Sequence, residues 1–275
     1  MSRSLEKEWE RILRKEEKNL DKIKRKTAEE NLSKFTELKQ GISEKIPDKL
    51  IITINEGFQK AFRLIFSKGT NAIERTFKKE EIILDFAVND FRVNQRPNSK
   101  SLKLLDKKVK KGNRFNTLAT MAEGVGLGAM GIGLPDIPLF LAILLKGIYE
   151  TAIGYGYNYK KEKEQVLILK MITASLSEPD KRLVADAEVE NWINLIEDED
   201  ITINIDEEIK KASNSLSQAL LLSKFIQGIF VVGMAGGIAN PIIYQKVMRY
   251  VTRMYKKRYL IQKRLSIKNE RKTIL

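Results

Sequence analysis

Three charged residues border apolar, Gly-rich stretches of the sequence: Glu123, Asp136 and Lys224. A carboxylate buried among apolar residues without a partner has a raised pKa, and such carboxylates serve as acids or bases in active sites. Lys224 could pair with Glu123 or Asp136 if the two stretches cross, although a buried pair can also have a purely structural role. Asp136 follows a proline and can cap a helix that starts at Ile137. We favour this capping role and keep all three residues as catalytic candidates.

Three further polar residues are candidates for ligand binding. Tyr155 begins a Tyr-Gly-Tyr stretch that closes a predicted helix, and its neighbour Gly156 suits the C-terminal cap of that helix. Glu162 follows soon after and could face the same cluster of charged groups. Asn240 precedes a proline, and this pair is a turn signal that can leave the amide exposed.

The composition excludes several kinds of chemistry. The 275-residue chain has no Cys and no His, so it lacks disulfides, thiol nucleophiles and zinc sites of the usual ligand type. Residues 126–131 match the spacing GxGxxG, but the residues before them predict a helix where a dinucleotide site needs a strand. We therefore expect neither a metal nor a cofactor.

Two Gly-rich, almost uncharged segments lie around residues 118–145 and 225–245. A bilayer-spanning helix needs roughly 20 consecutive apolar residues. The second segment has 21 uncharged residues but includes polar side chains and four Gly, whereas Glu123 and Asp136 interrupt the first. Prolines beside Asp136 favour a break in the helix there. Three interpretations stay open: buried core helices, a hairpin that enters the membrane part-way, or true spans.

Pairs of glycines four residues apart predict how the two segments pack. Gly124 and Gly128 form one GxxxG pair, and Gly233 and Gly237 form another. A helix face made of small residues lets two backbones approach closely. We therefore expect the two segments to be helices that cross each other through these glycines.

Charge is sorted into blocks along the chain, whose formal net charge is +14. Residues 246–275 contain eleven Lys and Arg against one acid, whereas residues 185–208 contain ten acids and no base. A basic tail directly after an apolar segment suits an anionic membrane, where each Lys or Arg contributes about 1 kcal/mol. The alternative is an ordinary helix end that folds back on the acidic block. Nucleic acid ranks last as a partner, because aromatic-interleaved basic motifs are absent.

The remaining sequence predicts helices, with only residues 201–205 (ITINI) resembling a strand. Residues 1–44 form a charged, amphipathic helical arm that either packs one stripe on the body or serves a partner or membrane surface. We therefore predict an all-α fold with three parts. These are the arm at 1–44, a helical domain at 45–265 in which the two Gly-rich segments pack together, and a basic tail at 266–275.

An ordered set of these features resembles the EcsC protein family of bacteria, over about residues 45–265. The set comprises the Gly-rich stretch ending in GLPDIP at 133–138, the Tyr-Gly-Tyr with Glu162 and Glu164 after it, and KFIQG at 224–228 followed by glycines and Asn240. The resemblance implies an α-helical protein. The family takes its name from an operon that also encodes the ATPase and membrane subunits of an ABC transporter, which suggests work near a membrane. It supplies no catalytic residues to carry over.

These observations favour a membrane-associated, non-enzymatic helical protein that binds lipid or a membrane partner, with a role accessory to an ABC transporter implied by the resemblance. We expect it at the cytoplasmic face of the membrane, peripheral or partly inserted, because the N-terminus lacks the apolar core of a secretory signal. A cytoplasmic location is the alternative. The rival function is an enzyme acting on a lipid or apolar substrate, in which Glu123, Asp136 and Lys224 converge on a pocket.

Overall fold

The computed structural model describes residues 3–30, 47–112, 136–197, 201–226 and 241–273. Within these ranges every regular element is a helix, which confirms the all-α prediction. In chain order the elements are α1 (Arg3–Glu30), α3 (Asp48–Leu64), the π-helix η1 (Ile65–Gly69), α4 (Thr70–Glu74), α5 (Lys79–Gln95), α6 (Ser99–Gly112), α8 (Asp136–Gly154), α9 (Glu162–Leu176), α10 (Pro179–Leu195), α11 (Ile205–Ile226) and α12 (Pro241–Thr273).

The strand expected at residues 201–205 is wrong. Residues 201–204 are irregular, and α11 begins at Ile205. A strand requires a neighbouring strand to pair its backbone groups, and the described part of the chain offers none. The isoleucines of this stretch instead pack, partly buried, against the hydrophobic core.

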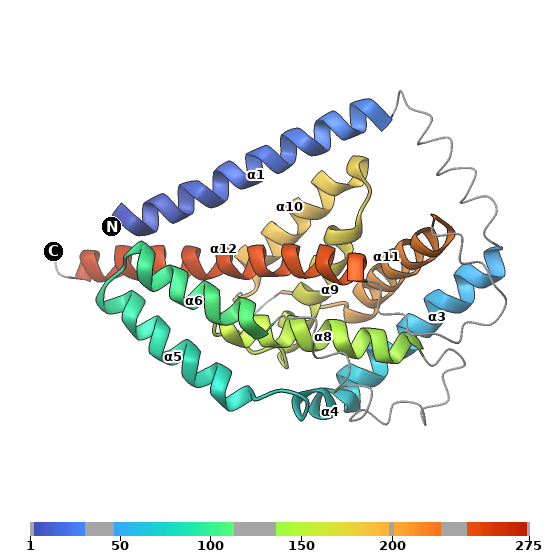
Figure 1. The fold of residues 1–275 in the computed structure, drawn as a ribbon, viewed down its shortest axis with the longest axis horizontal. Helices are drawn as coiled ribbons and strands as arrows, with labels where there is room; N and C mark the ends of the chain where they lie inside the picture. The colour runs from blue at the N-terminus through green and yellow to red at the C-terminus, as the bar shows by residue number, and fades with distance from the viewer. Residues whose placement is uncertain (1–2, 31–46, 113–135, 198–200, 227–240, 274–275) are drawn as a thin grey trace.

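Helices α8 and α9 lie at the centre of the fold (Figure 1). Helix α8 packs against α3, α5, α6 and α12, and α9 packs against α10, α11 and α12. Residues 137–154 of α8 are long and apolar enough to cross a membrane, but 94% of this stretch is buried inside the protein. Helix α8 therefore occupies the position of a core helix.

A glycine cap ends α8 and turns the chain back into the core. Gly156 has a φ of +87°, which favours glycine, and its N–H donates to the carbonyl of Ile153 at 3.0 Å. The N–H of Tyr157 donates to the carbonyl of Ala152 at 2.9 Å, which completes a Schellman motif. The cap expected at Gly156 is confirmed, and the turn directs the buried Tyr155 and Tyr157 inward.

Helix α1 packs one stripe of its surface on the body. Leu5 and Ile12 are buried, and the ring of Trp9 lies 4.6 Å from the guanidinium of Arg264 on α12. Figure 1 shows α1 close to α12 near the N-terminus and diverging from it toward residue 30. Of the two interpretations of the arm, packing on the body is therefore the one the structure supports.

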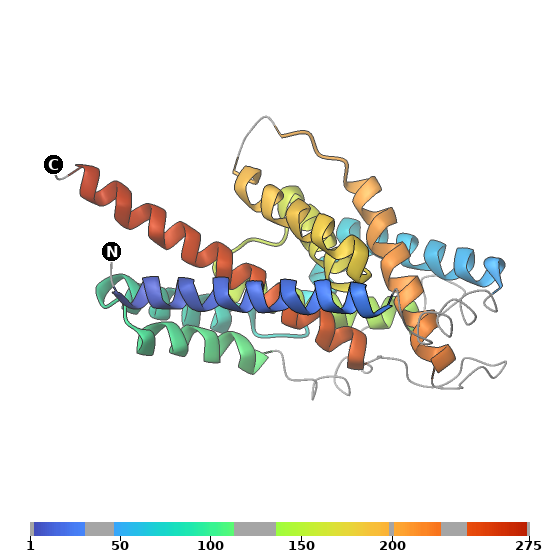
Figure 2. The ribbon, with the colours of Figure 1, turned by 90° about the horizontal axis from the view of Figure 1, so that it is seen from above.

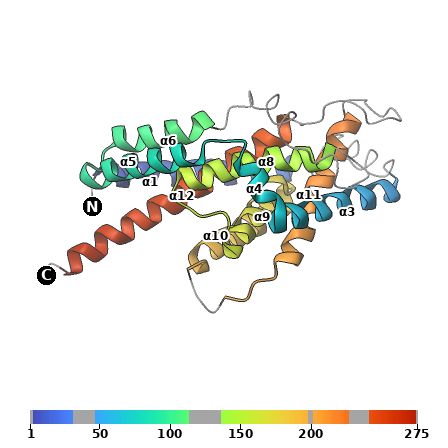
Figure 3. The same ribbon diagram turned by 90° about the horizontal axis from the view of Figure 1, so that it is seen from below.

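The helices that lead into and out of the Gly-rich segments are described, although residues 113–135 and 227–240 are not. In Figure 2, α6 and α11 end and α12 begins along the lower side of the molecule. In Figure 3 the same ends lie along the upper side, with the start of α8 just beneath them. We call this side the segment face. The terminal residues of these four helices are Gly112, Asp136, Ile226 and Pro241.

Candidate functional site

Helix α12 contains most of the C-terminal positive charge, and the cations of its stretch from Lys256 to Arg264 point toward carboxylates of other helices. The ammonium group of Lys256 lies 2.6 Å from Asp106 Oδ2 on α6 and 3.1 Å from Glu8 Oε2 on α1. The other pairs are Lys257 with Glu16 and Glu190, Arg258 with Glu164 and Glu197, Lys263 with Asp90, and Arg264 with Glu6.

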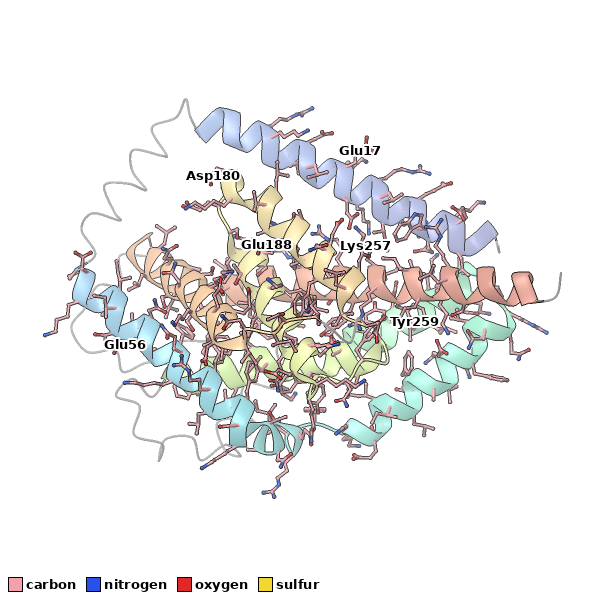
Figure 4. The ribbon with its side chains drawn as sticks, turned by 180° about the vertical axis from the view of Figure 1, so that it is seen from behind. Glu17, Glu56, Asp180, Glu188, Lys257 and Tyr259 are labelled. Carbon is pink, nitrogen blue, oxygen red and sulfur yellow. The ribbon has the colours of Figure 1, made fainter. Side chains whose placement is uncertain are left out.

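These ion pairs neutralise the middle of α12 from within the protein. Figure 4 shows Lys257 on the side of α12 that faces α1 and α10, and Tyr259 on the side that faces α5. Lys257 reaches Glu190 at 2.7 Å, and Arg258 reaches Glu197 at 3.0 Å, so α12 does fold back on the acidic block of residues 185–208. Among the described side chains, each cation between Lys256 and Arg264 is therefore paired with a carboxylate, and this stretch offers little uncompensated positive charge to a partner.

A recurring triad of tyrosine, carboxylate and cation holds the helices together. At the centre, the Tyr255 hydroxyl donates to Glu164 Oε1 at 2.8 Å, and Arg258 Nη1 donates to Glu164 Oε2 at 2.7 Å. All three side chains are buried. The same arrangement recurs as Tyr155–Asp106–Lys256, Tyr259–Asp90–Lys263, Tyr250–Asp186–Arg182 and Tyr159–Glu74–Lys160.

The protonation states of the triads favour a structural role over a catalytic one. Desolvation raises the pKa of Tyr155, Tyr255 and Tyr259 well above the ordinary value, and the neighbouring carboxylates raise it further. The hydroxyls therefore stay protonated and act as donors. Burial lowers the pKa of Arg258, but the contact with Glu164 outweighs burial, so the net pKa is raised and the guanidinium stays charged. Each carboxylate already accepts hydrogen bonds from at least two donors.

Among the carboxylates that the structure describes, Glu74 has the most strongly shifted pKa, and its contacts join α4 to the turn after α8. Burial opposes its ionisation, but hydrogen bonds from Tyr159, Lys160 and Lys79 outweigh burial and lower its pKa to about 2. The Tyr159 ring stacks on that of Tyr149, with centroids 4.0 Å apart. Within the described ranges, no cluster of three or more acidic side chains could hold a metal ion.

Helix α8 contains a buried ion pair between a lysine and a glutamate. It resembles the buried acid–base site expected from the sequence, although it is formed by other residues. Lys146 Nζ lies 3.0 Å from Glu150 Oε1, and the two side chains are 5% and 7% exposed. Burial outweighs the attraction of Lys146 and raises the pKa of Glu150. Tyr244 of α12 crosses this turn closely, since a Cβ at Gly147 would meet its hydroxyl at 2.5 Å. Burial, together with Glu150, raises the pKa of Tyr244 to about 12.

Two of the candidate ligand-binding residues have described side chains. Tyr155 is buried, and its hydroxyl donates to Asp106 Oδ1 at 3.0 Å, so it forms part of a triad. Glu162 is exposed in the first turn of α9. Glu164, two residues later, forms the buried triad with Tyr255 and Arg258, whereas Glu162 lies on nearly the opposite face of α9. The charged cluster expected near Glu162 involves side chains outside the described residues.

The other candidates fall at the edge of the described residues or outside them. Asp136 is the first residue of α8, so this helix starts one residue earlier than expected, and Lys224 lies in the last turn of α11. Their side chains lie outside the described residues, and the pocket they were expected to form stays a prediction. The same holds for the remaining candidates, which are Glu123, Asn240, Gly124, Gly128, Gly233 and Gly237.

The structure defines an all-helical protein tied together by a basic helix that runs through its core. The model of the EcsC protein family matches residues 6–260, so the chain belongs to this family, and the match includes α1. The chain is also similar to Protein EcsC of Bacillus subtilis (strain 168), with 28% identity over 165 residues. That alignment covers 59% of this chain and 61% of the relative, which is less than two thirds of its length. No solved structure matches the chain.

Proposed function

We propose that the protein is a membrane-associated, non-enzymatic helical protein that meets a lipid surface with its segment face and binds lipid or a membrane partner there. The main support for this proposal is the arrangement of four helix ends. The helices that lead into and out of residues 113–135 and 227–240 all end or begin on one side (Figures 2 and 3). These two stretches are apolar and poor in charge, and a lipid surface is the environment that accepts such sequence.

The location of α8 and α12 narrows the proposal. Helix α8 has the length and composition of a span but is buried in the body, and the paired cations of α12 face other helices. The buried stretch of α8 and the ion-paired stretch of α12 from Lys256 to Arg264 are therefore not the parts that contact lipid. We place the protein at the cytoplasmic face of the membrane, and the family resemblance suggests a membrane subunit of an ABC transporter as its protein partner.

Vesicle flotation tests the proposal. The purified full chain is mixed with phosphatidylcholine vesicles, with or without phosphatidylglycerol, and centrifuged through a sucrose gradient. We expect the chain to float with the anionic vesicles. A chain that stays in the bottom fraction with both kinds of vesicle contradicts the proposal. Carbonate extraction of native membranes then separates peripheral attachment from insertion.

The buried pair of Lys146 and Glu150 favours one second candidate, an enzyme acting on a lipid or apolar substrate. A carboxyl group with a raised pKa in an apolar helix is a suitable acid or base, and Tyr244 lies beside it. Incubation of the protein with a total lipid extract, followed by mass spectrometry, tests this function. Enzymatic action requires a product with the wild type that is lost in Glu150→Gln, whereas the non-enzymatic proposal expects no product from either.

A further inference from the structure

Helix α5 exposes a row of large apolar side chains. Leu84, Val88 and Phe91 recur at steps of four and three residues, so they share one face, and Ile83 lies beside them. Their exposed fractions are 65%, 41%, 63% and 46% in the order Leu84, Val88, Phe91, Ile83. Single exposed hydrophobic residues are normal on soluble proteins, but a contiguous row on one helix marks a surface that another phase or molecule covers.

Helix α6 runs next to α5 and contributes positive charge. Lys100, Lys103 and Lys107 are exposed on one face of α6, and Leu104 between them is 38% exposed. Among the described residues, none of these three ammonium groups forms a salt bridge, in contrast to the cations of α12. Their charge is therefore available to an anionic partner.

The two helices form a hairpin at one end of the molecule. Helix α5 ends at Gln95, and the Asn98 side chain accepts hydrogen bonds from the backbone N–H groups of Lys100 and Ser101 at 3.0 and 2.9 Å, which caps α6. The inner faces pack on the body, where Asp90 binds Tyr259 and Asp106 binds Tyr155. No described helix covers the outer side of the pair (Figures 1 and 3). Helix α6 then leads to the segment face.

We propose that this surface, which we call the hairpin patch, is where the protein contacts the headgroups and interface of an anionic membrane. The patch consists of Ile83, Leu84, Val88 and Phe91 of α5 with Lys100, Lys103, Leu104 and Lys107 of α6. Apolar side chains beside uncompensated lysines are the composition of interfacial membrane binding, because the former enter the interface while the latter lie over anionic headgroups. The inference rests on the proposed function and adds the hairpin patch as a second contact surface beside the segment face, to which α6 leads.

Flotation of full-length variants tests the hairpin patch. The charge variant is Lys100→Gln/Lys103→Gln/Lys107→Gln. We expect it to lose about a hundredfold in partitioning to phosphatidylglycerol vesicles, since each lysine contributes about 1 kcal/mol and every 1.4 kcal/mol is tenfold. The apolar variant is Leu84→Gln/Phe91→Gln, and we expect it to lose the binding that remains at high salt. Because all five side chains are exposed, both variants should keep the helical circular dichroism and melting temperature of the wild type.

A matched control uses exposed residues elsewhere. Leu183→Gln/Val184→Gln changes two apolar side chains on α10 that are 38% and 64% exposed, and we expect it to float like the wild type. The proposed role of the hairpin patch is wrong if the wild type floats and the patch variants float equally well. It is also wrong if the α10 control loses as much vesicle binding as the patch variants. In both cases the proposed function stands. If the wild type does not float with anionic vesicles, both are overturned.

Discussion

Arg258 of α12 donates to Glu164 of α9 at 2.7 Å, and the two side chains are only 6% and 5% exposed. The guanidinium also lies 3.9 Å from the centroid of the Tyr157 ring, so three segments meet at this cation. A buried charge that loses its partner is costly, whereas a complete pair is tolerated. The fold therefore depends on a matched set of charges along α12.

Removing the acid of this pair should destabilise the protein strongly. Glu164→Gln leaves Arg258 buried with its main partner gone, so we expect the free energy of unfolding to fall by about 3–5 kcal/mol in urea denaturation. Glu162→Gln, two residues earlier and exposed, is the matched control and should stay within about 0.5 kcal/mol of the wild type. Equal effects at the two positions contradict a buried pair. A double variant, Glu164→Leu/Arg258→Met, should recover much of the loss.

Acid should weaken the protein partly through Glu74. Its pKa is about 2 in the folded state against an ordinary 4.5, so its contribution to stability is present above pH 4.5 and is lost as the pH falls toward 2. Glu74→Gln cannot titrate, and its stability should fall less steeply across that window in urea unfolding at a series of pH values. The exposed Glu80→Gln serves as control and should keep the wild-type slope. Parallel curves for the wild type and Glu74→Gln count against the lowered pKa.

Helix α1 should be the most easily released element. Glu8 and Glu16 bind Lys256 and Lys257, and among the described side chains of α1 the buried apolar ones are Leu5 and Ile12. In Glu8→Gln/Glu16→Gln, the amides of α1 should exchange with deuterium faster by tenfold or more, because two ion pairs to partly buried lysines are lost. Exchange in α9 should change much less. Unchanged protection of α1 means that apolar contacts alone hold it.

Gly156 should tolerate no side chain. Gly156→Ala places a Cβ at positive φ, which costs about 1–2 kcal/mol, and within 2.4 Å of the Phe86 ring, which adds about 1–3 kcal/mol. Thermal melts should therefore show a large loss. Gly69→Ala has a negative φ and a nearest contact at 3.3 Å, so its loss should be smaller. In a Phe86→Ala background, Gly156→Ala should lower the stability by less, because the clashing ring is gone. If the stability losses of the two changes simply add, the clash with Phe86 is contradicted.

The local features of the fold could be predicted from the sequence. Hydrophobic period indicated α1 and the stripe with Leu5 and Ile12, and the cap at Gly156 followed from glycine's access to positive φ. These features depend on residues a few positions apart. The strand expected at 201–205 was wrong because β-branched residues favour a strand only when a partner strand exists, and residues 201–204 are irregular instead.

The partners of α12 could not be predicted, because they depend on how distant helices pack. Lys256 and Asp106 are 150 positions apart in the sequence, and no spacing indicates their contact. The charge count showed a basic block and an acidic block along the chain and left their contact as one of two alternatives, and two ion pairs do join these blocks. The sequence pattern selected Glu162 as a candidate and gave no role to the buried Glu164, because both residues fit a helix and only packing decides which of them faces inward.

A single-cysteine fluorescence measurement tests most directly whether the segment face meets the membrane. The chain has no Cys, so Ile242→Cys and Asn194→Cys each give one labelling site. Ile242 is 63% exposed at the start of α12 on the segment face, whereas Asn194 is near the end of α10 on the opposite side (Figure 2). With an environment-sensitive dye and anionic vesicles, we predict a blue shift at Ile242→Cys and none at Asn194→Cys. A shift at both positions, or at neither, contradicts membrane contact through the segment face.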